Sequence, residues 1–279
     1  MKLKDCITFS FKDALARAKA ESAQQASHYL ILHHGDSTRP LWQQHLCTNS
    51  HFCRTVVANG YLTHQQMQRS ALRYRLGMAR DGGVIFWQID HAEHVYDGKI
   101  MYYQDNCHRD HHHNPTWVSA ELMHFYLGDD YPYDCLPAFS HCLFGTHLLR
   151  EDWSNSSDSC DSCSLKPVAI VEVEKTAIIC SERYPRFIWL APGGLEALKP
   201  EVLFPLRQRK IILFPDIDET GETYKKWYAI ARSAQRLLGQ PLYVSPFLEL
   251  NATPDQKRRK IDLADYLYES HTDLTDSTD

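Results

Sequence analysis

The chain has 279 residues, of which 43% are hydrophobic and 23% charged, and its formal net charge is −5. This length and composition are typical of a globular protein with one large or two ordinary domains, and they exclude wholesale disorder, collagen-like repeats and a disulfide-rich miniprotein. The acidic balance argues against a protein that wraps duplex DNA by neutralising phosphates over a broad surface, although a local basic site is compatible with it.

The N-terminal region, residues 1–60, is expected to be helical or irregular and suggests no role. A helical pattern runs from Phe11 to Tyr29, but charged residues interrupt it, so the segment lacks the apolar run of a signal peptide. No later segment has the roughly 18 consecutive apolar residues of a membrane span. The sequence therefore predicts a cytoplasmic protein with no membrane partner and with its nine cysteines reduced.

Residues 61–150 are expected to form an α+β domain. Thr63 is a favourable N-cap for a helix over residues 64–76, whose apolar side chains recur at helical spacing up to Leu76, and Gly77 is expected to close it. Two runs rich in β-branched and aromatic residues follow, Val84–Asp90 and Val95–Tyr103. Their pattern predicts a β-hairpin whose aromatic side chains pack into a core rather than stack on unpaired bases.

A Ser- and Asp-rich linker at residues 151–165 precedes a change of pattern. From residue 166 to residue 270, short continuous apolar runs alternate with helical segments, which predicts an α/β domain with a parallel sheet flanked by helices. The expected strands are residues 167–173, 186–191, 210–216 and 241–246. Residues 271–279 are polar and are expected to form a disordered tail.

Acidic residues follow several of these strands. Sites in parallel α/β sheets form at the carboxyl ends of the strands, where carboxylates can supply the oxygen ligands that Mg²⁺ prefers. A further carboxylate from a neighbouring strand can act as a general acid or base. The six residues at such positions are Glu172, Glu174, Asp216, Asp218, Asp262 and Asp265.

The runs VEVEKTAII and ILFPDIDETG resemble the Toprim domain, with its glutamate after the first strand and its Asp-x-Asp after a later one. Together with YRLG, GGVIFWQID, DGKIMYY and WLAPGGLEAL, they are similar to Toprim-domain primase-like proteins of bacterial mobile elements, related to the catalytic core of bacterial primases, over roughly residues 60–270. Val173 and Ile217 stand where many primases have glycine, which bears on catalytic competence and not on the fold.

The resemblance implies roles for particular residues. Glu172 would be the catalytic acid or base, and Asp216 and Asp218 would be ligands of Mg²⁺ or Mn²⁺. Glu174, Asp262 and Asp265 are candidates for a further acidic motif. Contacts with phosphate are assigned to Lys175, Gly193, Gly194, Lys257 and Arg258, although ordinary ion pairs and a solvated loop are alternative interpretations for the three cations.

The activity implied is Mg²⁺-dependent nucleotidyl or phosphodiester transfer on nucleic acid, primase-like, in the replication of a mobile element or phage. A Toprim nuclease and a non-catalytic protein that binds nucleic acid or a partner remain open alternatives. The chain has no P-loop, so priming would need a helicase or another replication or mobilisation protein to present single-stranded DNA.

Zinc is not expected. Cys160 and Cys163 have half of a zinc-ribbon spacing, and no second pair completes it. The run from Cys107 to His113 contains one cysteine and four histidines, but consecutive side chains cannot all face one ion, so it is interpreted as a His-rich loop.

Overall fold

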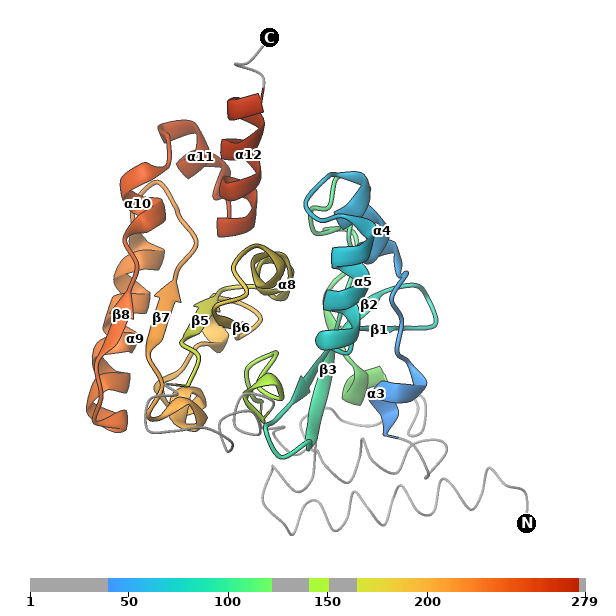
Figure 1. Ribbon diagram of the computed structural model, residues 1–279, viewed down its shortest axis with the longest axis horizontal. Coiled ribbons are helices and arrows are strands. Elements are labelled where there is room, and N and C mark those ends of the chain that lie inside the picture. Colours follow the sequence, from blue (N-terminus) through green and yellow to red (C-terminus); the bar gives the residue numbers. More distant parts are fainter. Residues whose placement is uncertain (1–39, 122–140, 151–164, 276–279) are drawn as a thin grey trace. The chain divides into compact units, whose positions relative to one another are not determined.

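The computed structural model describes residues 40–121, 141–150 and 165–275. The chain divides into two compact units, one made of Met1–Gly60 and Met67–Cys142 and the other of Tyr61–Gln66 and Leu143–Asp279 (Figure 1). The predicted helix at residues 11–29 and almost all of the predicted linker lie outside the described residues. Within the described ranges, no helix combines the length and the apolar character that crossing a membrane requires.

The first unit contains an antiparallel sheet in the order β1-β2-β3-β4. Its strands are β1 (Gly77–Met78), β2 (Val84–Ile89), β3 (Val95–Met101) and β4 (Thr116–Trp117), and its sequence also forms α3 (Leu41–Gln44) and α4 (His51–Ala58). The predicted hairpin is confirmed, since β2 and β3 pair from Val84–Met101 at one end to Ile89–Val95 at the other.

The hairpin packs its large side chains inward. Phe86 and Trp87 are fully buried, which confirms the expectation of core packing for these two residues. Gly98 lies opposite Trp87, and a Cβ atom at Gly98 would come within 2.7 Å of Ile85 Cγ2 and 2.8 Å of Trp87 Cε3. The glycine therefore allows the indole ring to approach the backbone of the neighbouring strand closely.

Helix α5 (His64–Arg73) begins as predicted and ends earlier. Thr63 Oγ1 accepts a hydrogen bond from Gln66 N, and Gln66 Oε1 accepts one from Thr63 N, which is a capping box. The prediction that Gly77 closes the helix is wrong, because the chain leaves it at Arg73, Arg75 takes a left-handed conformation with φ of 56°, and Gly77 lies in β1.

The second unit contains a parallel sheet in the order β6-β5-β7-β8. Its strands are β5 (Val168–Val171), β6 (Ile188–Leu190), β7 (Ile211–Phe214) and β8 (Leu242–Val244). All four lie within predicted strands, and their parallel pairing confirms the predicted type of sheet. Every side chain of β5 is fully buried, as expected for a central strand covered on both faces.

Helices flank this sheet (Figure 1). Helix α8 (Glu174–Arg183) packs against β5 and β6, and α9 (Glu222–Leu238) packs against β8. The remaining elements are the 3₁₀-helices η2 (Leu195–Ala197) and η3 (Pro200–Leu206) and the helices α10 (Phe247–Asn251), α11 (Pro254–Arg259) and α12 (Leu263–Thr275). The connections after β5 and β7 lead into α8 and α9 and carry Glu172, Asp216 and Asp218, whereas Glu174 lies in α8 and Asp262 and Asp265 lie at the start of α12.

Candidate active site

Glu172 and Asp216 lie at neighbouring positions on the carboxyl edge of the parallel sheet. Strands β5 and β7 are adjacent and parallel, and Val171 at the end of β5 pairs with Phe214 at the end of β7. Glu172 follows β5 directly, and Asp216 follows β7 after Pro215. The topology therefore brings the two carboxyl groups together from positions 44 residues apart in the sequence.

Asp216 has the most unusual environment of the predicted site residues. The residue as a whole is partly exposed, but its Oδ1 atom is buried and has no hydrogen-bond partner among the described residues. Burial, the charge of Glu172 and that of Asp262 raise the pKa of Asp216 well above its ordinary value. A buried carboxylate oxygen without a donor is costly, and a proton or a cation would relieve that cost.

Asp218 is held differently, at the beginning of α9. Its Oδ1 accepts hydrogen bonds from Thr220 N at 2.8 Å, Thr220 Oγ1 at 2.6 Å and Glu222 N at 3.2 Å, while its Oδ2 accepts one from Thr223 N at 2.8 Å. Burial alone would raise the pKa of Asp218, but these hydrogen bonds outweigh it and lower the pKa below its usual range. Asp218 is thus ionised and caps the helix that follows.

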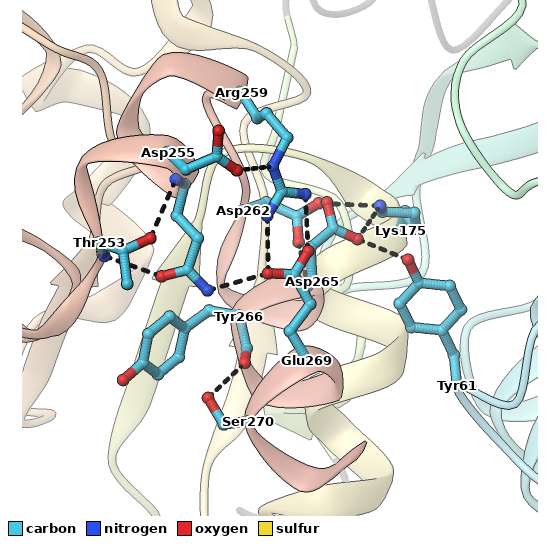
Figure 2. Close-up of polar contacts among 11 residues, drawn as sticks. Tyr61, Lys175, Thr253, Asp255, Arg259, Asp262, Asp265, Tyr266, Glu269 and Ser270 are labelled. Carbon is cyan, nitrogen blue, oxygen red and sulfur yellow. Dashed lines mark hydrogen bonds and ion pairs between the residues drawn. The ribbon is translucent and has the colours of Figure 1, made fainter. Parts of the chain in front are cut away.

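Lys175 links the two later acidic residues, as Figure 2 shows. Its Nζ lies 3.1 Å from Asp262 Oδ2 and 2.9 Å from Asp265 Oδ1, and all three side chains are buried. Burial alone would lower the pKa of Lys175, but the two carboxylates raise it well above its ordinary value. Burial alone would raise the pKa of Asp262, but Lys175 lowers it. Lys175 and Asp262 are therefore charged.

Tyr61 completes this group although it is far away in the sequence. Its hydroxyl donates a 2.7 Å hydrogen bond to Asp265 Oδ1, and Lys175 Nζ lies 5.5 Å from the centre of its ring (Figure 2). Burial, above all, raises the pKa of the Tyr61 hydroxyl, which stays protonated as a donor. Sequence reasoning missed Tyr61, because nothing in its local sequence marks a residue that reaches an acid 204 positions away.

A second set of ion pairs joins α12 to α11. Arg259, in α11, makes a bidentate pair with Glu269 of α12, with N–O distances of 2.7 and 2.9 Å, and its Nε lies 2.9 Å from Asp255 Oδ2. These hydrogen bonds raise the pKa of Arg259. The clamp fixes α11 against α12 and so fixes Asp262 and Asp265 at the start of that helix (Figure 2).

The charges of the site do not balance. Besides burial, the charges of Glu172, Asp262 and Asp265 raise the pKa of Asp216, and Lys175 is the cation that lowers it. Three carboxyl groups and one ammonium group thus act on Asp216, and this excess of negative charge suits a divalent cation.

No ion-binding geometry with three ligands is preformed in the part of the chain that the structure describes. Across residues 40–121, 141–150 and 165–275, no group of three or more His, Cys, Asp or Glu side chains is placed to hold a metal ion. Mg²⁺, however, usually takes only one or two protein carboxylates and completes its octahedron with water and substrate phosphates. Asp216, with its unsatisfied Oδ1, fits the first of these roles.

The structure places the residues assigned to phosphate contacts as follows. Gly193 N donates a 3.2 Å hydrogen bond to Glu172 O, and Gly193 and Gly194 have φ of 87° and 148°. Lys257 Nζ lies 3.3 Å from Glu249 Oε2, and Arg258 pairs with Asp255 at 2.9 Å. Glu174 is buried in the first turn of α8. Phosphate binding by these residues stays a prediction, and the two cations already have acidic neighbours.

The two segments that sequence analysis considered for zinc are the run from Cys107 to His113 and the pair Cys160 and Cys163. Cys107 is buried, and His113 stacks on Tyr102 with its Nδ1 2.7 Å from Asp110 Oδ2. Cys160 and Cys163 lie outside the described residues.

These features define an α/β protein with an acidic cluster at the carboxyl edge of a parallel sheet. The family called Domain of unknown function (DUF6371) matches residues 50–217, and the chain belongs to that family. The matched region contains Glu172 and Asp216 and ends before Asp218. No curated protein matches the chain. Among solved structures, the RNA polymerase domain of Mycobacterium tuberculosis primase DnaG is similar at 14% identity with a TM-score of 0.42, over 89% of this chain and 81% of that one.

Proposed function

We propose that this protein is a Toprim-type enzyme that uses Mg²⁺ or Mn²⁺ for nucleotidyl or phosphodiester transfer on nucleic acid, with primase-like synthesis in the replication of a mobile element or phage. The observation that carries the proposal is the buried, unpartnered Oδ1 of Asp216 beside Glu172. The resemblance of VEVEKTAII and ILFPDIDETG to the Toprim motifs supports this choice of chemistry.

Asp216 and Asp218 would hold the ion. A bound divalent ion polarises a phosphate oxygen and stabilises the charge that develops during transfer. Asp218 is ionised, and four hydrogen bonds fix its orientation. Glu172 lies on the adjacent strand end, where its carboxylate would accept a proton from an attacking hydroxyl or return one to the leaving oxygen.

Lys175, Asp262 and Asp265 would support the site rather than react. Asp262 and Asp265 raise the pKa of Asp216 through their charge, and Lys175 moderates that effect. Single-stranded DNA is the proposed template, presented by a helicase or another replication or mobilisation protein.

A non-catalytic role in binding nucleic acid is the second candidate. It is favoured by the extensive use of Asp218 in capping α9 and by the absence, within the described ranges, of a preformed group of three metal ligands. A nuclease would use the same residues as a primase, and only the product distinguishes the two.

The test is a product assay on the full-length chain with Mg²⁺ or Mn²⁺, single-stranded template and labelled nucleotides. New labelled oligonucleotides identify a primase, and shortened template identifies a nuclease. Asp216→Asn and Glu172→Gln should each abolish product, whereas Glu201→Gln, which removes an exposed acid of η3, should not. Equal product from natural chain and Asp216→Asn would refute the catalytic assignment. Template binding without product from the natural chain would favour the second candidate.

A further inference from the structure

Three tyrosines lie on the surface of the second unit at the edge of the parallel sheet. Tyr224 and Tyr228 are one turn apart on α9, with ring centres 6.4 Å apart and planes inclined by 21°. Tyr243 projects from β8 (Leu242–Val244), one of the two edge strands of the sheet. Tyr228 and Tyr243 are 50% and 54% exposed, and α9, which carries Tyr224 and Tyr228, packs against β8. Burial and the neighbouring Tyr243, Tyr228 and Glu249 raise the pKa of Tyr224, which agrees with one patch that has Glu249 beside it.

Two arginines continue the patch along α9. Arg232 and Arg236 follow Tyr228 at successive four-residue intervals, so they lie on the same side of the helix, about 6 Å apart along its axis. Both are exposed, and no carboxylate of the described residues pairs with either. By contrast, Lys225 and Lys226 on the same helix pair with Glu222 and Glu196. We call Tyr224, Tyr228, Tyr243, Arg232 and Arg236 the tyrosine–arginine surface.

We propose that the tyrosine–arginine surface binds single-stranded nucleic acid, with bases stacked on the tyrosines and phosphates on the arginines. Proteins that bind single strands without sequence preference combine aromatic platforms with cations that follow the backbone, and a base exposes its face for stacking only when it is unpaired. The exposed rings supply the platform, and the unneutralised arginines supply the charge.

The charge on this surface selects an anionic occupant over a second copy of the chain. Strand β8 has an open edge, which in other proteins can pair with a second molecule. Two copies joined through this surface would bring the arginine pairs of both molecules together, and the like charges would repel. A polyanion meets no such penalty.

This surface involves none of the residues assigned to catalysis, and only the choice of a nucleic acid as the occupant rests on the proposed function. Binding at the tyrosine–arginine surface requires no metal ion, so it can be measured in EDTA. EDTA removes divalent cations, so the proposed metal-dependent reaction does not occur during the measurement. If the natural chain forms no product but binds the oligonucleotide, the proposed enzyme is refuted and this inference stands.

The experiment measures fluorescence anisotropy of a labelled single-stranded oligothymidylate with the full-length chain in EDTA, over a series of salt concentrations. Tyr228→Ala combined with Tyr243→Ala should weaken binding at least about tenfold, because two stacking contacts are lost. Tyr228→Phe combined with Tyr243→Phe should restore it, since a phenyl ring also stacks. Arg232→Gln combined with Arg236→Gln should reduce the slope of log affinity against log salt by about 1.4, which corresponds to two phosphates.

The controls are Phe204→Ala, which removes an exposed aromatic ring of η3, and Lys199→Gln, which removes an exposed cation. Neither should change affinity more than about twofold. The inference is overturned if the natural chain does not bind the oligonucleotide in low salt. It is also overturned if the tyrosine-to-alanine chain binds like the natural one, or if the tyrosine changes abolish only a self-association seen by sedimentation. If the chain with Tyr228→Ala and Tyr243→Ala does not fold, the test rests on the arginine variant: an unchanged salt slope in Arg232→Gln with Arg236→Gln overturns the inference.

Discussion

Replacing Lys175 with methionine should destabilise the second unit strongly. The change keeps most of the side-chain volume and removes the ammonium group that pairs with Asp262 at 3.1 Å and with Asp265 at 2.9 Å. Only 7% of the Lys175 side chain is exposed, and the two carboxylates are 9% and 11% exposed, so water cannot replace the lost partner. Removing one member of a buried ion pair costs about 3–5 kcal/mol.

That loss is a large share of a typical unfolding free energy of about 5–15 kcal/mol. The value for the second unit alone can be obtained from hydrogen exchange of the amides in β5 and β7, its central strands. Adding Asp265→Asn to Lys175→Met leaves one uncompensated carboxylate instead of two. The double variant should therefore be more stable than the sum of the single changes predicts, by about 1–2 kcal/mol.

Two results would refute this account of the buried pairs. One is a loss below about 1 kcal/mol for Lys175→Met, which would mean that solvent or another cation compensates the acids. The other is strict additivity of Lys175→Met and Asp265→Asn, which would mean that the two residues do not interact in solution. A matched change of an exposed pair, Lys225→Met, should cost less than about 0.5 kcal/mol.

Three further changes test other parts of the structure. Burial raises the pKa of Asp97 to about 6 despite hydrogen bonds from Ser119, so the folded first unit binds a proton more tightly than the unfolded chain. Its stability should fall by up to about 3 kcal/mol as pH rises from about 4 to about 6, and Asp97→Asn should flatten that dependence in urea unfolding at a series of pH values. Gly98→Ala forces Cβ against Ile85 and should cost about 1–3 kcal/mol; an unchanged thermal midpoint would contradict the packing. Tyr61→Phe removes the donor to Asp265 and should cost about 1–2 kcal/mol by hydrogen exchange of α12, and no loss would show that the bond does not form in solution.

Much of the fold was predictable because its signals are local. The continuous apolar runs around β5 and β7 predict buried parallel strands, and Thr63 with Gln66 predicts the start of α5. The end of α5 was not predictable in the same way. Arg75 enters the left-handed region without being a glycine, and its guanidinium pairs with Glu93 at 2.5 and 3.0 Å, 18 residues later. This long-range ion pair offsets the local preference of a non-glycine residue for negative φ, which is the only preference that the neighbouring sequence expresses.

The candidate site likewise has parts that the sequence pattern predicts and parts that it does not. The strand-end positions of Glu172 and Asp216 follow from the alternating pattern, because adjacent parallel strands end at one edge. The pairing of Lys175 with two acids nearly 90 residues later does not follow from spacing, nor does the contact of Tyr61 with Asp265. Such contacts depend on how α12 packs on α8, which side-chain shape determines and local pattern does not.

Asp218 joins the two functions assigned to the connection after β7, and its two oxygens are used unequally. Oδ1 accepts three hydrogen bonds at the start of α9, whereas Oδ2 accepts one from Thr223 N, and a hydrogen bond from the Thr223 side chain also lowers the pKa of Asp218. In the proposed site, an ion bound by Asp218 would therefore have to share this carboxylate with the first turn of α9.

Asp218→Asn separates the two roles. The amide oxygen can still accept from Thr220 and Glu222, but the amide nitrogen in place of Oδ2 neither accepts from Thr223 N nor binds a cation. The free energy of unfolding should fall by only about 0.5–1 kcal/mol, while Mn²⁺ affinity measured by calorimetry should fall at least about tenfold. Asp216→Asn should reduce Mn²⁺ affinity similarly without faster hydrogen exchange at Glu222 and Thr223. If Asp218→Asn binds Mn²⁺ as tightly as the natural chain, Asp218 caps α9 and does not bind the ion. If Mn²⁺ speeds hydrogen exchange at the amides of Glu222 and Thr223 in the natural chain, the ion competes with the cap.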